Sequence, residues 1–293
     1  MTNQKSSWKF FGVATALALA ASLAMAGTAR AQFGGLKKLK EKAEKAQEAL
    51  KPMSVEEEKA VGREVAAKLI AAVGLMPDDV LTDYANLVGA TVAAQSERQE
   101  VPYRFAVLNS DTVNAFSAPG GYIFITKGAL LLCEDEAELA GVLAHEVGHV
   151  AGRHVLKIYE RDKAMRAGMD EAGSRMPGSK YLEDFSKKIL IKVIDQGLVE
   201  GDEYDADQRG VKYAHMAGYP ADGLSRFLAK LEEATTSKGK SSFWTKTHPP
   251  IAKRNERLAN IISTQSWQDA DKPKLAERYA SETDFVRGSG VTL

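Results

Sequence analysis

The sequence predicts a mostly helical α+β fold that contains one small mixed sheet. Apolar residues recur at helical spacing along most of the chain, whereas only Tyr103–Leu108 and Asn114–Ile125 show the pattern of strands. The 293 residues are 44% hydrophobic and 27% charged, as in ordinary folded proteins. Because a chain of this length buries a full core, we expect one principal globular domain, over residues 53–265.

Residues 1–31 have a different composition from the rest of the chain. Lys5 and Lys9 precede an uncharged apolar run that ends in small residues, which is the pattern of a secretory signal peptide. Two Ala-x-Ala sites end at Ala26 and Ala31, and we favour cleavage at the second. The alternative is a retained membrane anchor. We therefore expect a periplasmic protein with no transmembrane segment after signal cleavage.

The charge balance and the single cysteine narrow the classes of function. The chain carries 39 basic and 39 acidic residues, so no basic surface recommends nucleic acid as a partner. Cys133 is the only cysteine and excludes an intramolecular disulfide. We expect it to be a small buried hydrophobic residue.

Local signals place the elements of the first half of the chain. Residues 32–52 alternate charged residues with Leu and Ala, which predicts an exposed amphipathic helix or tether. A capping box at Ser54 and Glu57 starts a helix that ends near Gly74, and another helix covers Asp79–Ala94. The predicted strands follow, and the second strand segment contains a glycine-rich turn.

The second half of the chain is predicted to be helical. The polar segment Arg161–Lys188 is expected to be a helical but mobile excursion, and residues 266–293 are expected to form a C-terminal extension. The predicted helices are Asp135–Ile158, Lys188–Gly210, Pro220–Ala234 and Ile251–Ile262.

The segment His145-Glu146-Val147-Gly148-His149 carries the clearest chemical signal. Two imidazoles four residues apart lie about 40° apart around a helix and one turn along it, so both can reach one metal ion. Glu146 lies about 100° from His145, which lets its carboxylate contact a water molecule on the metal without binding the metal itself. This is the position of a general base.

A catalytic zinc ion usually keeps three protein ligands and one exchangeable water, so one ligand must come from elsewhere in the chain. Glu203 and Asp207 lie four residues apart on a predicted helix. We expect Glu203 to be the third ligand and Asp207 to accept a hydrogen bond from a ligand imidazole. The alternative is a solvated acidic helix start. The expected cofactor is one Zn²⁺ ion per chain.

Four segments together resemble the gluzincin metallopeptidases of the HtpX and CAAX prenyl-protease type, in particular their soluble periplasmic BepA- and LoiP-like branch. The resemblance covers roughly Ser54–Asn260. No spanning helices surround the motif, and we expect no helical-repeat domain after it. The four segments are Asn114-Ala115-Phe116 with Pro119-Gly120-Gly121, the His145–His149 motif, Glu203 with Ala206-Asp207, and His248-Pro249-Pro250 followed by Arg254.

The resemblance implies a thermolysin-like fold with an HExxH helix in the active site. It implies that the strand carrying Asn114 and Ala115 pairs with an extended substrate beside the zinc ion. It also implies that His248 lies near the metal and that Arg254 braces the His248 loop or the site. His248 either donates a hydrogen bond to the oxyanion or occupies the fourth zinc position as a latch, and the sequence does not choose between the two.

The sequence therefore predicts a zinc-dependent endopeptidase that cuts extended or misfolded polypeptides of the bacterial cell envelope, with Glu146 as the base and His248 as a second catalytic residue. The alternative is a periplasmic assembly factor that holds unfolded outer-membrane proteins with little proteolysis, with the outer-membrane assembly machinery as a partner. A purely structural zinc ion is disfavoured because Glu146 stands beside a three-ligand set. His154 and His215 are expected to be structural or surface residues.

Overall fold

The computed structural model describes residues 40, 41, 43, 44, 47, 51–168, 178–191, 197–237, 248–269 and 271–288. The chain divides into two compact units, residues 1–51 with 163–170, and residues 52–162 with 171–293. In the first unit, residues 40, 41, 43, 44 and 47 are helical and exposed. The expected signal peptide lies outside the described residues. The second unit holds every predicted site residue.

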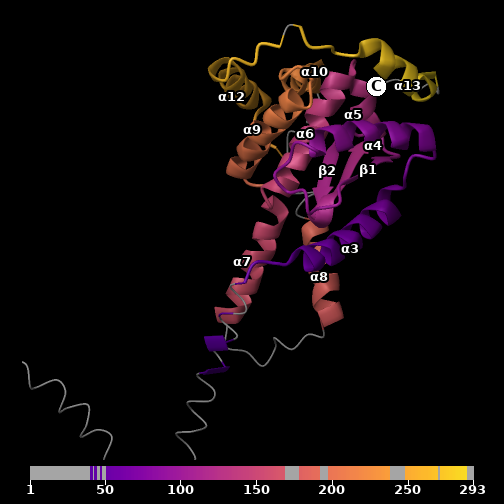
Figure 1. Cartoon of the computed structure of the whole chain (residues 1–293). Coiled ribbons are helices and arrows are strands. Elements are labelled where there is room, and N and C mark those ends of the chain that lie inside the picture. Colours follow the sequence, from indigo (N-terminus) through magenta and orange to yellow (C-terminus); the bar gives the residue numbers. More distant parts are fainter. Residues whose placement is uncertain are drawn as a thin grey trace, which may run out of the picture. The chain divides into compact units, whose positions relative to one another are not determined.

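The second unit contains a three-stranded mixed sheet, as the sequence predicts. Its strands are β1 (Arg104–Leu108), β2 (Ala115–Ala118) and β3 (Tyr122–Thr126), in the order β1-β3-β2. Strand β3 pairs in parallel with β1 and antiparallel with β2. Strand β2 therefore lies at one edge of this sheet, with β3 as its partner among the described residues (Figure 1).

The turn between β2 and β3 is the short 3₁₀ helix η1 (Pro119–Gly121). Gly120 has a φ of +73°, and a Cβ atom there would lie 2.8 Å from the Cα atom of Lys59. Only glycine combines this left-handed conformation with so close a neighbour. The glycine-rich turn predicted from the sequence is confirmed.

Helix α3 (Val55–Val73) begins at the predicted capping box, in which the Glu57 amide donates to Ser54 Oγ over 3.3 Å. The buried carboxylate of the next residue, Glu58, accepts two hydrogen bonds from Arg98, of 3.1 and 2.8 Å. The Gly120 amide donates to the same carboxylate over 3.0 Å.

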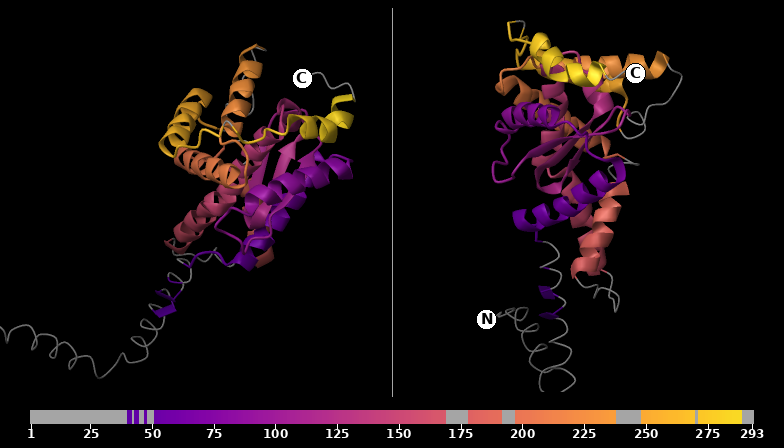
Figure 2. Two further views of the ribbon diagram at one scale, coloured as in Figure 1. Left: turned by 45° about the horizontal axis from the view of Figure 1, so that its top comes forward. Right: turned by 90° about the vertical axis from the view of Figure 1, so that its right-hand side faces the viewer.

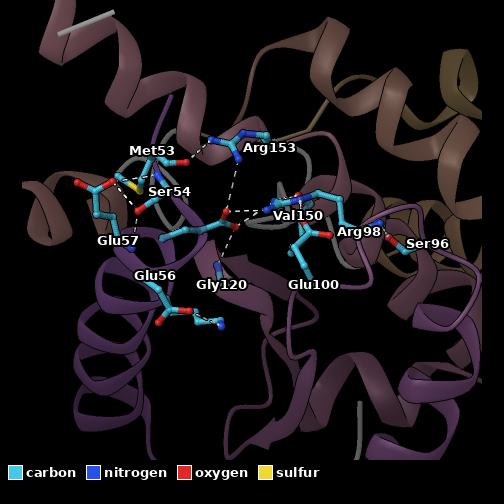
Figure 3. Close-up of polar contacts among 12 residues, drawn as sticks. Met53, Ser54, Glu56, Glu57, Ser96, Arg98, Glu100, Gly120, Val150 and Arg153 are labelled. Carbon is cyan, nitrogen blue, oxygen red and sulfur yellow. Dashed lines mark hydrogen bonds and ion pairs between the residues drawn. The ribbon is translucent and has the colours of Figure 1, made fainter. Parts of the chain in front are cut away.

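The Glu58–Arg98 pair joins four parts of the unit. Arg98 also donates to the Val150 carbonyl over 3.1 Å, and Arg153 Nη1 lies 3.7 Å from the Glu58 carboxylate (Figure 3). The pair thus connects α3, the loop before β1, the η1 turn and the end of helix α6 (Glu136–Ala151), which carries His145 and His149. It fixes β2 relative to that helix.

The metal-motif helix α6 (Glu136–Ala151) forms the centre of the core. All 16 of its residues are buried, and it lies between the sheet and the helices α9 (Glu200–Met216) and α10 (Gly223–Ser237) (Figure 1). Helix α4 (Asp79–Ala93) also packs against α6, and α5 (Lys127–Leu132) precedes it. Cys133, between α5 and α6, is fully buried, as expected.

Two predicted helices are interrupted in the structure. The predicted helix Asp135–Ile158 is wrong, because α6 ends at Ala151 and α7 (His154–Gly168) starts anew after Arg153, which has a φ of +55°. The left-handed conformation of Arg153 breaks the helical ladder.

The predicted helix Lys188–Gly210 is also wrong. Helix α8 (Gly178–Ile191) ends before Gly197, which has a φ of +69°, and α9 begins at Glu200. Helices α7 and α8 occupy the described parts of the expected excursion Arg161–Lys188, and the rest of it lies outside the described residues.

The last two helices complete the same unit. Helix α12 (Ile251–Thr264) packs on α9 and α10, and α13 (Ala276–Gly288) packs on α4, α5 and α6 (Figure 2). Tyr279 of α13 is fully buried, and its hydroxyl donates to the Leu130 carbonyl. Residues 271–288 thus pack into the same core as the predicted domain. Among the described residues, no helix has both the length and the apolar character needed to cross a membrane.

Candidate active site

Close packing of α6 on α9 brings the two metal-ligand motifs together. A Cβ atom on Gly148 would lie 2.8 Å from the Ala206 carbonyl oxygen, and one on Gly210 would lie 2.8 Å from the His145 amide nitrogen. The backbones approach this closely because both positions lack a side chain. Glu203, one turn before Asp207 on α9, consequently faces the histidines of α6.

The four predicted groups nearest the metal position converge. The Nε2 atoms of His145 and His149 are 3.0 Å apart. The carboxylate oxygens of Glu203 lie 3.7 Å from His145 Nε2 and 3.5 Å from His149 Nε2. His248, which lies just before α12, places its Nε2 atom 3.6 Å from Glu203 Oε2. Ligand atoms of His145, Glu203 and His248 all lie within 4.8 Å of one another.

These distances suit a tetrahedral zinc ion. Two ligand atoms each about 2.0–2.1 Å from a tetrahedral ion are roughly 3.3 Å apart. Among the described residues, Glu203 Oε2 has no hydrogen-bond partner although it is buried, which is costly unless a cation satisfies it. Nitrogen and carboxylate donors are the ligands that zinc accepts.

The buried charges at the site also favour the binding of a cation. The buried carboxylates of Glu146, Glu203 and Asp207 face one buried guanidinium, that of Arg254, which leaves a formal surplus of two negative charges. Burial raises the pKa of Glu203 well above its ordinary value, and nearby Asp207 and Glu146 raise it further, although Arg254 lowers it. Burial lowers the pKa of His149, which leaves its imidazole neutral and able to bind a metal.

Asp207 and Arg254 form a fixed pair behind His145. The carboxylate of Asp207 lies 2.9 Å from His145 Nδ1 and accepts hydrogen bonds of 2.9 and 2.6 Å from Arg254. Burial opposes ionisation of Asp207, but Arg254 and His145 hold its pKa below the ordinary value. The His145 proton therefore sits on Nδ1 and donates to Asp207, and Nε2 keeps its lone pair for a metal.

Glu146 faces a pocket beside the ligands. The pocket has an empty volume of about 320 Å³, part of it open to solvent, and is lined by residues of α6 and β2, by Glu203 and by His248. Burial raises the pKa of Glu146 to about 7, although Ser117 and Arg254 act to lower it. The carboxyl thus titrates near neutral pH, where it can take up and release a proton.

Strand β2 presents backbone groups at its outer edge, next to the pocket. The Thr126 amide donates to the Asn114 carbonyl over 3.0 Å, so Asn114 faces β3. Backbone groups alternate along an antiparallel pair, and those of Ala115 and Ser117 therefore face outward. Asn114 Oδ1 accepts from the Ala115 amide over 2.9 Å, which leaves the Ala115 carbonyl and both groups of Ser117 at the edge.

The sequence interpretation missed one histidine of the site. His154 is fully buried, and its Nδ1 atom lies 2.9 Å from Nδ1 of His149. The helical spacing between His149 and His154 gave no sign that the two rings meet, because the chain turns at Arg153. His215, by contrast, stacks on Trp267 with ring centroids 4.6 Å apart and pairs with Asp269, in a separate part of the fold.

Comparison with known proteins gives a consistent result. Residues 82–262, more than half of the chain, match the sequence model of peptidase family M48. The chain is 28% identical over 207 residues to the beta-barrel assembly-enhancing protease of Yersinia pestis, which covers 67% of this chain and 42% of that protein. It is 30% identical over 193 residues to metalloprotease LoiP of Escherichia coli, covering 62% of this chain and 69% of LoiP.

A mitochondrial relative matches as well. The metalloendopeptidase OMA1 of Schizosaccharomyces pombe is 26% identical over 178 residues, which is 60% of this chain and 52% of that protein. The chain thus spans less than half the length of the Yersinia pestis protease and about half that of OMA1.

Proposed function

The chain belongs to peptidase family M48, a family of zinc metallopeptidases, and on this basis we propose that it is a zinc-dependent endopeptidase that cuts extended polypeptides in the bacterial cell envelope. The observation that carries the proposal is the position of Glu146. Its carboxylate shares one pocket with the proposed ligands His149 and Glu203 and with the edge of β2.

The proposed zinc ligands are His145, His149 and Glu203, which supply two neutral nitrogens and one carboxylate. When bound, zinc would acidify a water molecule and polarise the scissile carbonyl. Asp207 holds the His145 ring in its ligating tautomer, and Arg254 holds Asp207.

Glu146 moves the proton in the proposed reaction. Its carboxylate takes a proton from the attacking water molecule and later delivers it to the leaving amine. The pKa of about 7 belongs to the protein without metal, and a bound dication would lower it by stabilising the carboxylate. A base that is ionised at neutral pH is the expected consequence.

The edge of β2 aligns the substrate. A peptide in extended conformation can add to this edge as a further strand, through the Ala115 carbonyl and the backbone groups of Ser117. A folded domain cannot offer a free extended segment, so the expected substrates are unfolded or misfolded polypeptides. The Asn114 side chain keeps the Ala115 amide occupied and so helps to set the register of the added strand.

His248 acts as a latch in our proposal. Its Nε2 atom lies as close to Glu203 as the other imidazoles do, and His145, Glu203 and His248 place ligand atoms within 4.8 Å of one another, so His248 can act as a further protein ligand. Four protein ligands close a zinc site, whereas a catalytic site keeps one position open for water. His248 must therefore move aside before water can enter. The oxyanion role would instead require His248 to remain in place during the reaction.

The cell-envelope location rests on the signal-like segment at residues 1–31 and on the relatives whose names refer to beta-barrel assembly. From these names, outer-membrane proteins are the proposed substrates and their assembly machinery is a candidate partner. The rival function, a factor that only holds such proteins, has no use for a base beside a metal site.

The test compares the chain with Glu146→Gln, each also carrying His248→Ala to remove the proposed latch. We expect both proteins to bind one zinc ion, and casein cleavage to fall at least about 100-fold in the Glu146→Gln variant. Full cleavage by zinc-loaded Glu146→Gln would refute the proposed mechanism. Zinc binding without cleavage by either protein, together with retention of an unfolded outer-membrane protein, would favour the holding factor.

A further inference from the structure

We propose that His154 is a positioning residue for the zinc ligand His149, and that Asp205 fixes the tautomer in which His154 acts. This inference rests on the proposed function, because it takes His149 as a zinc ligand. It assigns a role to a buried histidine and to a carboxylate that the proposed reaction does not use.

The three groups form a continuous chain of contacts. His149 Nδ1 lies 2.9 Å from His154 Nδ1, and the two rings meet edge to face with centroids 5.0 Å apart. On the far side of its ring, His154 Nε2 lies 3.0 Å from Asp205 Oδ2. Arg209 holds that same oxygen through its Nε atom, over 2.6 Å.

Hydrogen-bond chemistry allows one arrangement of protons once His149 binds zinc. The Nε2 atom of His149 faces His145 and Glu203, so it must be the ligand atom and the proton must sit on Nδ1. That proton is donated to His154 Nδ1, which must then be unprotonated. His154 consequently carries its proton on Nε2 and donates it to Asp205, which as a carboxylate only accepts.

The local backbone is shaped to hold this arrangement. A Cβ atom on Gly152 would lie 2.3 Å from His154 Nε2 and 2.9 Å from Asp205 Oδ2, so the imidazole occupies the space that a side chain would need. Arg153 adopts a left-handed conformation, which turns the chain back so that the first residue of α7 faces α6. Arg153 is held in this turn by a hydrogen bond of 3.1 Å to the Met53 carbonyl.

Helix α9 therefore supports both histidine ligands as well as providing one ligand itself. Asp207 contacts His145 directly, whereas Asp205 contacts His149 through the ring of His154. His149 thus receives a neutral acceptor where His145 receives a carboxylate. The two ligands differ in how strongly their partners polarise them.

The main test measures zinc affinity by competition with a chromogenic chelator, using the full chain. His154→Phe keeps the volume of the ring but removes the acceptor, and we expect it to weaken zinc binding about 10–100-fold. His154→Asn places an amide oxygen near the position of Nδ1, and we expect it to recover most of the affinity. The control His215→Asn changes a histidine that also pairs with an aspartate, outside the site, and should leave the affinity unchanged.

Two results would overturn the proposal. One is unchanged zinc affinity in a folded His154→Phe protein, and the other is an Asn variant as weak as the Phe variant. If His154→Phe does not fold, ¹⁵N NMR of histidine-labelled, zinc-loaded wild type decides the question, since we expect the His154 proton on Nε2 and a proton on Nδ1 would refute it. Failure of the proposed function would appear differently, as wild-type protein that binds no zinc or as zinc-loaded His248→Ala protein that does not cleave casein.

Discussion

Replacement of Arg98 by Met tests how strongly the buried Glu58–Arg98 pair holds the edge strand in place. The substitution removes both hydrogen bonds to the Glu58 carboxylate and the bond to Val150, at a position with 7% of its surface exposed. The Glu58 carboxylate then keeps the hydrogen bond from the Gly120 amide and the more distant charge of Arg153, whose Nη1 atom lies 3.7 Å away (Figure 3). A buried charge that loses its partner typically costs 3–5 kcal/mol of stability, and the remaining contacts favour the lower end, about 3 kcal/mol.

In a domain of this size, about 3 kcal/mol corresponds to a fall in Tm of roughly 6–12 °C. The assay is thermal and urea unfolding of the full chain at one fixed zinc concentration, since bound metal would add to the apparent stability. The control Glu56→Met removes an exposed ion pair of 2.8 Å with Lys59 on α3, the helix that carries Glu58. We expect it to change the free energy of unfolding by less than about 1 kcal/mol.

The double variant Glu58→Met/Arg98→Met decides the mechanism. With both charges gone, the unpaired carboxylate that destabilises the single variant is absent, so the double variant should be more stable than Arg98→Met alone. If the double variant loses as much stability as the two single variants together, the buried pair is not a coupled unit and the argument fails.

Three further predictions concern the metal site. His248→Ala should raise the casein-cleavage rate several-fold if His248 is a latch, whereas a fall in kcat with unchanged KM would support the oxyanion role. Gly210→Ala should reduce the zinc content, because the added Cβ atom would lie 2.8 Å from the His145 amide nitrogen. The control Gly201→Ala lies on the same helix, meets open space and should leave the zinc content unchanged. Equal zinc content in the two variants would contradict the role of close packing between α6 and α9. Arg254 holds the pKa of Asp207 below its ordinary value of about 4, so the stability from Asp207 is present at neutral pH and is lost as the pH falls below that value toward the folded pKa. Urea unfolding in EDTA should therefore show a steeper acid decline for wild type than for Asp207→Asn, and identical slopes would count against the pairing.

Much of the candidate site could be predicted because its residues repeat along helices. His145 and His149 stand four residues apart, and so do Glu203 and Asp207, so each pair lies on one face of its helix whatever the tertiary fold. The mixed sheet and its glycine-rich turn also follow from local sequence. The two helices meet through the close contact at Gly148 and Gly210. This contact is set by tertiary packing, which the helical periodicity of a single sequence does not reveal.

The parts that were not predicted depend on backbone turns and long-range contacts. Arginine has no preference for the left-handed region, so neither the helix break at Arg153 nor the return of His154 toward His149 was foreseeable from residue type. Gly197 did offer a signal for the second helix break, since glycine at an interrupted helical pattern often marks an end. Packing of α13 depends on Tyr279 and on Arg278, which pairs with the buried Glu136 of α6.

The complete burial of α6 sets two timescales within one metal site. Local opening is rarest where the surrounding apolar contacts are densest, so we expect the amide hydrogens of the turns that carry His145 and His149 to exchange with solvent only when the whole unit unfolds. His248 lies just before α12, outside any regular element, and in our proposal it moves aside without opening that core. On this proposal, a metal bound by α6 would be retained through many cycles of His248 movement.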